Sequence, residues 1–297
     1  TVLGEKGTKI CVPIVGTTVK EILDATAVAC NTPCDVVELR IDYYERAHSI
    51  DAIIELLMLM KPQLKGRGLL FTWRTKGEGG EKSISSQDYF TMLECLIPTG
   101  LVDAIDIELF FDQDRMVKTI EFAKVHGVII VMSNHDFHGT PSREVIVNRL
   151  IQMKEFLADV PKIAVMPHTT GDVLTLLEAT AEVKALYPSD PIITMAMGPL
   201  GAVTRAAGAL FGNAMTFASA GKASAPGQID VHELKRILNT LDVDGVFAIT
   251  KSILVSNSYR SPGQGANMTI EFDASRSVPT ATENRPRNIA LLACIKI

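Results

Sequence analysis

The stretch KICVPIVGTTVKEILDATAVACNTPCDVVELRI, residues 9–41, contains two short apolar runs, KICVPIV (9–15) and DVVELRI (35–41). The amphipathic stretch VKEILDATAVAC (19–30) lies between them. Short runs rich in β-branched residues predict buried strands, and the apolar spacing between them predicts a helix. A strand, a helix and a second strand in this order are typical of two parallel strands joined by a helical crossover. The stretch therefore predicts an α/β fold.

The same unit recurs along the chain, with amphipathic stretches such as SREVIVNRLIQMKEF between the runs. Further runs are GLLFTWR (68–74), DAIDIEL (103–109), GVIIVMS (127–133), PKIAVM (161–166), PIITMAM (191–197) and NAMTFAS (213–219). Eight repeats over about 240 residues match the size of a closed (β/α)8 barrel. A doubly wound open sheet is the alternative, but no GxGxxG motif follows the first run. We therefore predict a (β/α)8 TIM barrel.

Composition excludes several classes of protein. Of 297 residues, 47% are hydrophobic and 21% are charged, which excludes a disordered chain. The longest charge-free stretches, 191–204 and 206–221, are broken by Gly or Pro, so no membrane span is expected. The net charge is −5 and the basic residues are scattered, which excludes a nucleic-acid binder. Five cysteines without CxxC pairing, and no evident signal peptide, favour a reduced, cytoplasmic protein.

The composition changes at about residue 243. Residues 244–297 carry six Lys or Arg and four Asp or Glu, a net charge of +2, whereas residues 1–243 carry −7. The later part is rich in Ser, Asn, Pro and Gly and lacks a helix-length amphipathic pattern. We therefore predict a catalytic barrel in 1–243 and an appended β-rich or irregular segment in 244–297.

Active sites of (β/α)8 barrels lie at the carboxyl ends of the strands, so polar residues there are candidates. Glu38 and Arg40 are two residues apart on one strand and share a face. Buried charges must pair with each other or with a ligand, and a structural ion pair is the alternative to a substrate contact. Arg74 ends the third run before TKGEGG, whose glycines are equally explained by a turn around Glu78.

The fifth run leads into SNHDFHGTP, with His135, Asp136 and His138 close together. Two histidines three residues apart make a weak metal site, and we predict no metal. A single histidine at a strand end suits general acid–base catalysis, because its ordinary pKa lies near neutrality. A structural histidine is the alternative.

Lys162 begins KIAVM, so its ammonium lies in an apolar strand. A lysine that points into a barrel is desolvated and is available as an amine to form a Schiff base with a carbonyl. The alternative is a lysine at the strand entrance that reaches solvent. Arg205 follows the seventh run, and Ser224 and Gln228 lie in the small-residue loop SAGKASAPGQ, a lid or a linker. Together these residues suit an anionic, hydroxylated carbonyl substrate handled through an imine.

Residues from about 9 to 241 resemble type I 3-dehydroquinate dehydratase. The motifs that carry the resemblance are VVELRID (36–42), EGGE (78–81), TGLVDAIDIEL (99–109), VMSNHDFHGTP (131–141), PKIAVMP (161–167), ITMAMGPLGAVTR (193–205) and SAPGQ (224–228). The resemblance implies a hydro-lyase of the shikimate pathway that removes water from 3-dehydroquinate in a syn elimination. It implies no cofactor, a homodimer, and departures from the family pattern at Pro13 and Thr204.

The resemblance also implies roles for individual residues. Lys162 matches the Schiff-base lysine, His135 the general acid/base, and Glu78 the glutamate that supports His135. Residues matched to substrate binding are Glu38, Leu39, Arg40, Arg74, Met197, Arg205, Ser224 and Gln228, with Arg205 assigned to the substrate carboxylate.

The tail from about 246 to 297, which includes EFDASRSVPTATENRPRNIALLACIKI, instead resembles the C-terminal end of bacteriophage tail-fibre proteins. Two alternative functions follow from the sequence. One is a class I Schiff-base aldolase on the same barrel, and the other is a non-catalytic attachment or interaction protein led by the tail.

Overall fold

The computed structural model describes residues 7–221 and 227–241, and they form alternating strands and helices. The strands are β1 (Lys9–Ile14), β2 (Val36–Arg40), β3 (Gly68–Thr72), β4 (Ala104–Glu108), β5 (Ile129–Asp136), β6 (Val160–Val165), β7 (Ile193–Ala196), β8 (Met215–Ser219) and the two-residue β9 (Ile229–Asp230). Each of the eight predicted runs coincides with one of β1 to β8. β9 was not predicted.

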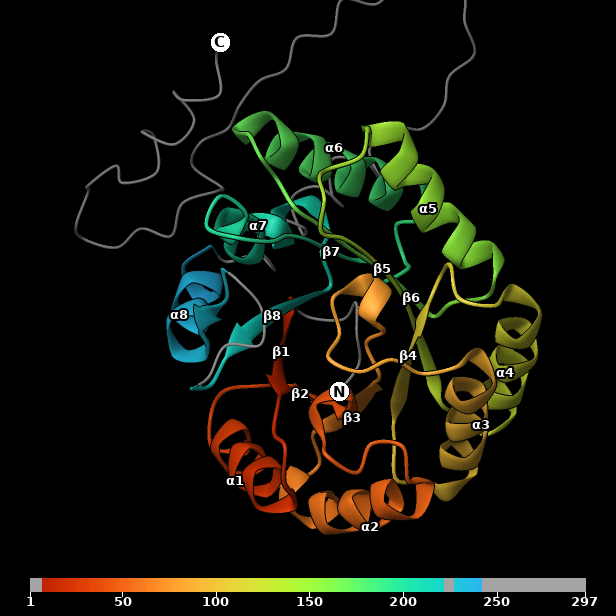
Figure 1. Ribbon diagram of the computed structural model, residues 1–297. Coiled ribbons are helices and arrows are strands. Elements are labelled where there is room, and N and C mark those ends of the chain that lie inside the picture. Colours follow the sequence, from red (N-terminus) through yellow and green to blue (C-terminus); the bar gives the residue numbers. More distant parts are fainter. Residues whose placement is uncertain (1–6, 222–226, 242–297) are drawn as a thin grey trace, which may run out of the picture. The chain divides into compact units, whose positions relative to one another are not determined.

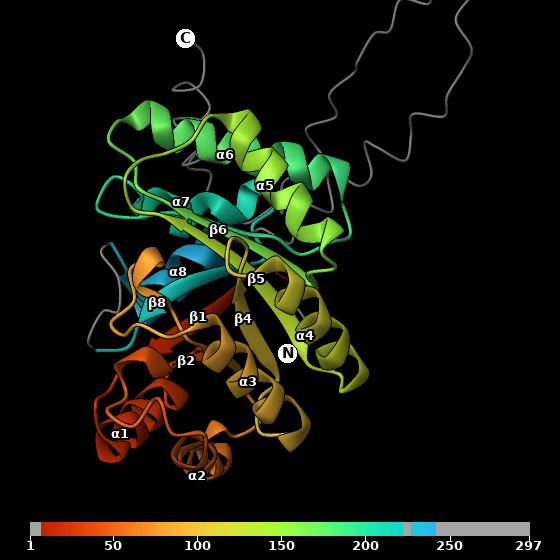
Figure 2. The same ribbon diagram turned by 45° about the vertical axis from the view of Figure 1, so that its right-hand side comes forward.

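The helices surround the strands in chain order (Figure 1). They are α1 (Val19–Cys30), α2 (Ile50–Met60), α3 (Ser86–Leu96), α4 (Gln113–Val125), α5 (Arg143–Glu155), α6 (Thr170–Leu186), α7 (Ala202–Ala207) and α8 (Val231–Leu241), with 3-10 turns η1 (Ile41–Tyr43), η2 (Lys61–Leu64), η3 (Lys76–Glu78), η4 (Ile97–Thr99) and η5 (Gly208–Phe211). α5 and α6 lie side by side in both views (Figures 1 and 2). Local sequence explains where α1 and α6 begin, because Thr18 and Thr169 each form a capping box with the acidic residue three positions later.

All strand pairs are parallel, and β1 to β7 pair in chain order, with β8 on the other side of β1. The barrel closes between β7 and β8 through a single bridge, Ile192 to Asn213. Ala214 N–H donates to the Ile192 carbonyl at 2.9 Å, and the Asn213 side-chain oxygen accepts from Thr194 N–H at 3.1 Å. The Asn213 side chain therefore accepts a backbone N–H that a backbone carbonyl would accept in a longer ladder. The predicted (β/α)8 barrel is confirmed.

The two-residue period of the strands divides their side chains between two cores. Outward side chains such as Leu39 belong to the larger core between strands and helices. Inward side chains form an apolar floor at the amino ends of the strands: Val36, Leu70, Val131, Val160, Ile193 and Met215. Polar inward residues such as Glu38, Arg40 and Lys162 come after this apolar layer along their strands, toward the carboxyl ends.

Among the described helices, none is long and apolar enough to cross a membrane. Residues 242–297 lie outside the described part of the chain. The appended segment and its boundary at residue 243 therefore stay predictions.

Candidate active site

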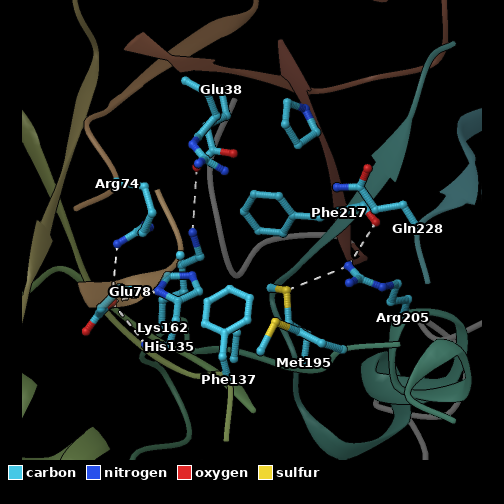
Figure 3. Close-up of a pocket in the computed structure, with 15 residues that line it drawn as sticks. Glu38, Arg74, Glu78, His135, Phe137, Lys162, Met195, Arg205, Phe217 and Gln228 are labelled. Carbon is cyan, nitrogen blue, oxygen red and sulfur yellow. Dashed lines mark hydrogen bonds and ion pairs between the residues drawn. The ribbon is translucent and has the colours of Figure 1, made fainter. Parts of the chain in front are cut away.

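A cavity of about 190 Å³ lies at the carboxyl ends of the barrel strands. Figure 3 shows the side chains that line it. They are Pro13, Glu38, Arg40, Arg74, Glu78, Gly79, His135, Phe137, Lys162, Ala164, Met195, Met197, Arg205, Phe217 and Gln228. Nine of the candidates named from the sequence therefore meet in one cavity: Glu38, Arg40, Arg74, Glu78, His135, Lys162, Met197, Arg205 and Gln228.

Lys162 points from β6 into this cavity and is only 3% exposed. Its Nζ lies 3.4 Å from Asp106 Oδ2 and 3.7 Å from Glu38 Oε1. The ammonium also lies 4.6 Å from the ring centroid of Phe217, within the range of a cation–π contact. The structure therefore excludes a lysine that reaches solvent at the strand entrance.

Glu38 and Arg40 share a face of β2, but they do not pair with each other. Arg40 forms a two-point ion pair with Asp42, with both N–O distances 2.8 Å. Asp42 is brought back toward Arg40 because the chain turns into η1 directly after β2. Glu38 instead accepts from the Thr72 hydroxyl at 2.9 Å and faces Lys162.

Arg74 lies in a buried cluster of carboxylates. Its guanidinium donates to Asp106 and to Glu108, both at 2.9 Å, and to Ser133 Oγ at 2.8 Å. Burial alone would lower the pKa of Arg74, but the negative charges of Asp106, Glu108 and Glu78 outweigh burial and hold it well above its usual value. The charge of Arg74 is thus largely neutralised by the protein.

Glu78 and His135 form the second ionisable pair of the cavity. Glu78 Oε2 lies 2.8 Å from His135 Nδ1 and accepts the His135 backbone N–H at 3.1 Å. Burial, followed by the charge of Glu108, raises the pKa of Glu78 to about 8. Burial, followed by the positive charges of Arg74 and Lys162, lowers the pKa of His135 well below its usual value. With Nδ1 on Glu78, Nε2 is the ring nitrogen left for a ligand.

Two glycines let the loop after β3 place Glu78 against His135. Gly79 ends η3 with φ of +84°, a conformation that other residues rarely adopt. A Cβ at Gly80 would lie 1.8 Å from the carbonyl oxygen of Arg74. Gly79 is therefore required for the turn, and Gly80 for the close approach of the loop to the end of β3.

Arg205 and Gln228 lie across the cavity from Lys162 and His135 (Figure 3). The Arg205 side chain is 1% exposed and donates to the Phe217 carbonyl at 3.4 Å. Burial lowers the pKa of Arg205 to about 10, so the guanidinium stays charged at neutral pH. Met197, 3% exposed, adds an apolar wall.

Of the predicted substrate contacts, Leu39 does not line the cavity. The Leu39 side chain points away from the barrel interior, because it lies between Glu38 and Arg40 on the strand, and it packs in the outer core. Ser224 lies outside the described residues.

The two carboxylates of β4 were not among the residues predicted from the sequence. Asp106 and Glu108 are buried and hold Arg74, and Asp106 also contacts Lys162. The signal was present in DAIDIEL, because two carboxylates separated by one apolar residue share a face, as Glu38 and Arg40 do.

In residues 7–221 and 227–241, no group of three or more His, Cys, Asp or Glu side chains could hold a metal ion. The chemistry at hand is that of a buried amine beside carboxylates, an imidazole held by a carboxylate, and a buried guanidinium across the cavity. Such a site can form an imine with a carbonyl group, move a proton at the neighbouring carbon and bind an anion.

Comparison with known proteins identifies close relatives of this chain. Residues 10–244 match the family model described as type I 3-dehydroquinase. The 3-dehydroquinate dehydratase of Bacillus licheniformis is 48% identical over 239 residues, which cover 80% of this chain and 94% of that protein. The enzyme of Clostridium novyi is 45% identical, covering 81% and 95%.

A solved structure of the same family also matches this chain. The type I 3-dehydroquinate dehydratase of Clostridium difficile, solved with covalently modified comenic acid, matches with a TM-score of 0.78 and 44% identity. The match covers 81% of this chain and 94% of that one.

Proposed function

The chain belongs to the type I 3-dehydroquinate dehydratase family and is a dehydratase of 3-dehydroquinate, and from this premise we propose that it acts through an imine on Lys162. The observation that carries the proposal is the burial of the Lys162 amine in the cavity, beside His135 and opposite Arg205. 3-Dehydroquinate carries a ring carbonyl, hydroxyl groups and a carboxylate, which correspond to these groups.

In the first step, the Lys162 ammonium passes one proton to His135, and the lone pair left on Nζ attacks the substrate carbonyl carbon. The carbonyl oxygen leaves as water after it takes up protons, one of them from His135 Nε2, and a C=N bond replaces the C=O bond. Glu38 and Asp106 lie close enough to Nζ to stabilise the positive iminium that results.

In the second step, His135 Nε2 removes a proton from the carbon next to the iminium carbon. The iminium accepts the electron pair, which lowers the cost of breaking that C–H bond. The pair then returns to form the C=C bond as the C–O bond of the neighbouring hydroxyl breaks. His135 gives its proton to that hydroxyl, and one water is lost by syn elimination.

In the last step, water adds to the iminium, the C–N bond breaks, and 3-dehydroshikimate leaves Lys162 free. Arg205 binds the substrate carboxylate through these steps, and Glu38, Arg40, Arg74, Met197 and Gln228 contact the rest of the ring. The buried, charged guanidinium of Arg205 supports its assignment.

Borohydride reduction in the presence of 3-dehydroquinate tests the imine. Reduction converts the C=N bond to a stable amine, so the peptide that contains Lys162 should gain the mass of the reduced ligand. Borohydride without substrate is the control. An unmodified Lys162 peptide in a turning-over sample would refute the imine.

We also propose that the protein works in the shikimate pathway, in the cytoplasm and as a homodimer, and that residues 244–297 are an appended segment. Family membership supports the first three, and the end of the family match at residue 244 supports the last. Light scattering on the full chain tests the dimer, since a monomer mass under assay conditions would refute it. Turnover after deletion of residues 246–297 tests the segment, since a chain that no longer folds would show that the barrel depends on it.

A further inference from the structure

The two oxygens of the Glu78 carboxylate are held by different parts of the fold. Oε2 faces His135 Nδ1 at 2.8 Å and Arg74 Nη1 at 3.4 Å. Oε1 accepts from the side-chain amide of Asn134 at 3.0 Å. Within the described residues, Asn134 is the one hydrogen-bond donor found on Oε1. Asn134 is 6% exposed, so water replaces this donor poorly.

The orientation of the Asn134 amide depends on Arg149 of α5. Arg149 Nη1 donates to Asn134 Oδ1 at 2.8 Å. The oxygen and nitrogen of a side-chain amide have nearly the same shape, so hydrogen-bond partners decide which of them faces which neighbour. A rotated Asn134 would bring its carbonyl oxygen against Glu78, and two acceptors would then face each other.

Arg149 is itself held in place on both sides. Its guanidinium lies 3.7 Å from Asp136 Oδ2 and 5.5 Å from the centroid of the Phe110 ring. The side chain remains 24% exposed, so its far side reaches the surface of α5. A continuous line of contacts therefore runs from the surface through Asn134 to Glu78.

We propose that Asn134 and Arg149 are positioning residues for the Glu78–His135 pair, with Arg149 fixing the Asn134 amide so that its N–H group faces Glu78. The inference rests on the proposed role of that pair as the acid and base of the reaction. The pair holds either one or two protons. With two protons, His135 Nε2 bears a hydrogen and can act as an acid. With one proton, which lies between His135 Nδ1 and Glu78, Nε2 is free to act as a base. The proton affinity of the pair thus decides which form is present at a given pH.

Several charged groups set that proton affinity, and they come from every element around Glu78. Burial, then the charge of Glu108, raises the pKa of Glu78, and Asp106 acts in the same direction. Arg74 and the Asn134 hydrogen bond oppose them. On the His135 side, the positive charges of Arg74, Lys162 and Arg40 lower the pKa of His135. Arg149 acts through its hydrogen bond to Asn134, and Asp136 acts through its ion pair with Arg149.

The test compares three variants with a matched control. Arg149→Gln removes the charged donor, Arg149→Lys retains one, and Asn134→Asp replaces the amide donor by an acceptor. Arg143→Gln is the control, because Arg143 lies on the same helix and pairs at 3.4 Å with Glu182 of α6. Neither residue lines the cavity, and both side chains are about half exposed. The readouts are the acid limb of the kcat/KM–pH profile and an NMR titration of the His135 ring without substrate.

The midpoints of the acid limb and of the His135 titration should both move to higher pH, by about one unit in Arg149→Gln and further in Asn134→Asp. The reason is that the Glu78 carboxylate loses the hydrogen bond from Asn134. Arg149→Lys should lie close to the unmodified protein, and Arg143→Gln should coincide with it. Titrations of Arg149→Gln and the unmodified protein that coincide would overturn the inference, even if Asn134→Asp does not fold. The NMR titration needs no turnover, so a missing borohydride adduct would refute the imine and leave this test intact.

Discussion

Asp106→Asn probes the buried charge cluster formed by Arg74, Asp106, Glu108 and Lys162. Asp106 is fully buried and accepts from Arg74 at 2.9 Å and Ser133 at 2.6 Å, with Lys162 at 3.4 Å. An asparagine of the same shape keeps one acceptor but removes the negative charge, which leaves two buried cations less well paired. Removing one member of a buried ion pair costs about 3–5 kcal/mol, and we expect about 3 kcal/mol because Glu108 still holds Arg74.

For a domain of this size, about 3 kcal/mol corresponds to a Tm lower by about 6–12 °C. Thermal and urea unfolding at neutral pH measure the change. The control is Asp24→Asn, which removes the exposed ion pair between Lys20 and Asp24 and should leave Tm unchanged. An Asp106→Asn protein as stable as the Asp24→Asn protein would show that the cluster does not depend on this charge.

The pH dependence of stability is a second test of the role of the Asp106 charge. Burial tends to raise the pKa of Asp106, but Arg74 and Lys162 outweigh it, so the pKa of Asp106 is lower in the folded protein than in the unfolded chain. A lowered pKa stabilises the fold above the unfolded value of about 3.9, and this contribution disappears as the pH falls below it. The unmodified protein and Asp106→Asn should therefore differ less in free energy of unfolding as the pH falls below about 4.

Three further predictions concern the cavity itself. Lys162→Met should abolish turnover while the far-ultraviolet circular dichroism stays that of the barrel, and near-normal turnover would contradict the imine. Gly80→Ala should lower both activity and Tm, because its Cβ would lie 1.8 Å from a backbone carbonyl, whereas Gly68→Ala, whose Cβ would meet its first neighbour at 3.9 Å, should change activity little. Equal effects of the two would refute that account. Arg205→Gln should raise KM for 3-dehydroquinate by about tenfold or more, because a charged hydrogen bond to the substrate is lost. An unchanged KM would exclude Arg205 as the carboxylate ligand.

The sequence predicted the barrel and most of the residues in its cavity because both follow from short-range patterns. β-Branched runs mark strands, and the carboxyl end of each strand marks the cavity, so His135 could be named as a candidate. Lys162 could be named because its charge interrupts an apolar strand. Partners of buried charges were harder to predict. Arg40 pairs with Asp42, which a turn brings back, and Arg74 pairs with Asp106 and Glu108 of the next strand. Such pairings depend on register and turn geometry, which no single-sequence pattern specifies.

Leu39 illustrates a different limit. A motif match assigns neighbouring residues together, whereas strand geometry sends alternate side chains to opposite faces. The resemblance therefore grouped Leu39 with Glu38 and Arg40, although its side chain packs against the helices.

The single bridge that closes the barrel between β7 and β8 bears on how the fold opens. Each of the other strand pairs is joined through at least two residue pairs, whereas β7 and β8 share one bridge, beside which the Asn213 side chain accepts the Thr194 N–H. Native-state amide exchange should therefore begin at this seam, with Thr194 exchanging before the amides of β4 and β5. Met195 and Phe217, on the strands that flank the seam, also line the cavity. Local unfolding there would move the part of the cavity lining that Met195 and Phe217 supply, and it would leave the ion pairs of Arg74 with Asp106 and Glu108 in place. Ligand binding would therefore be lost before the fold is lost.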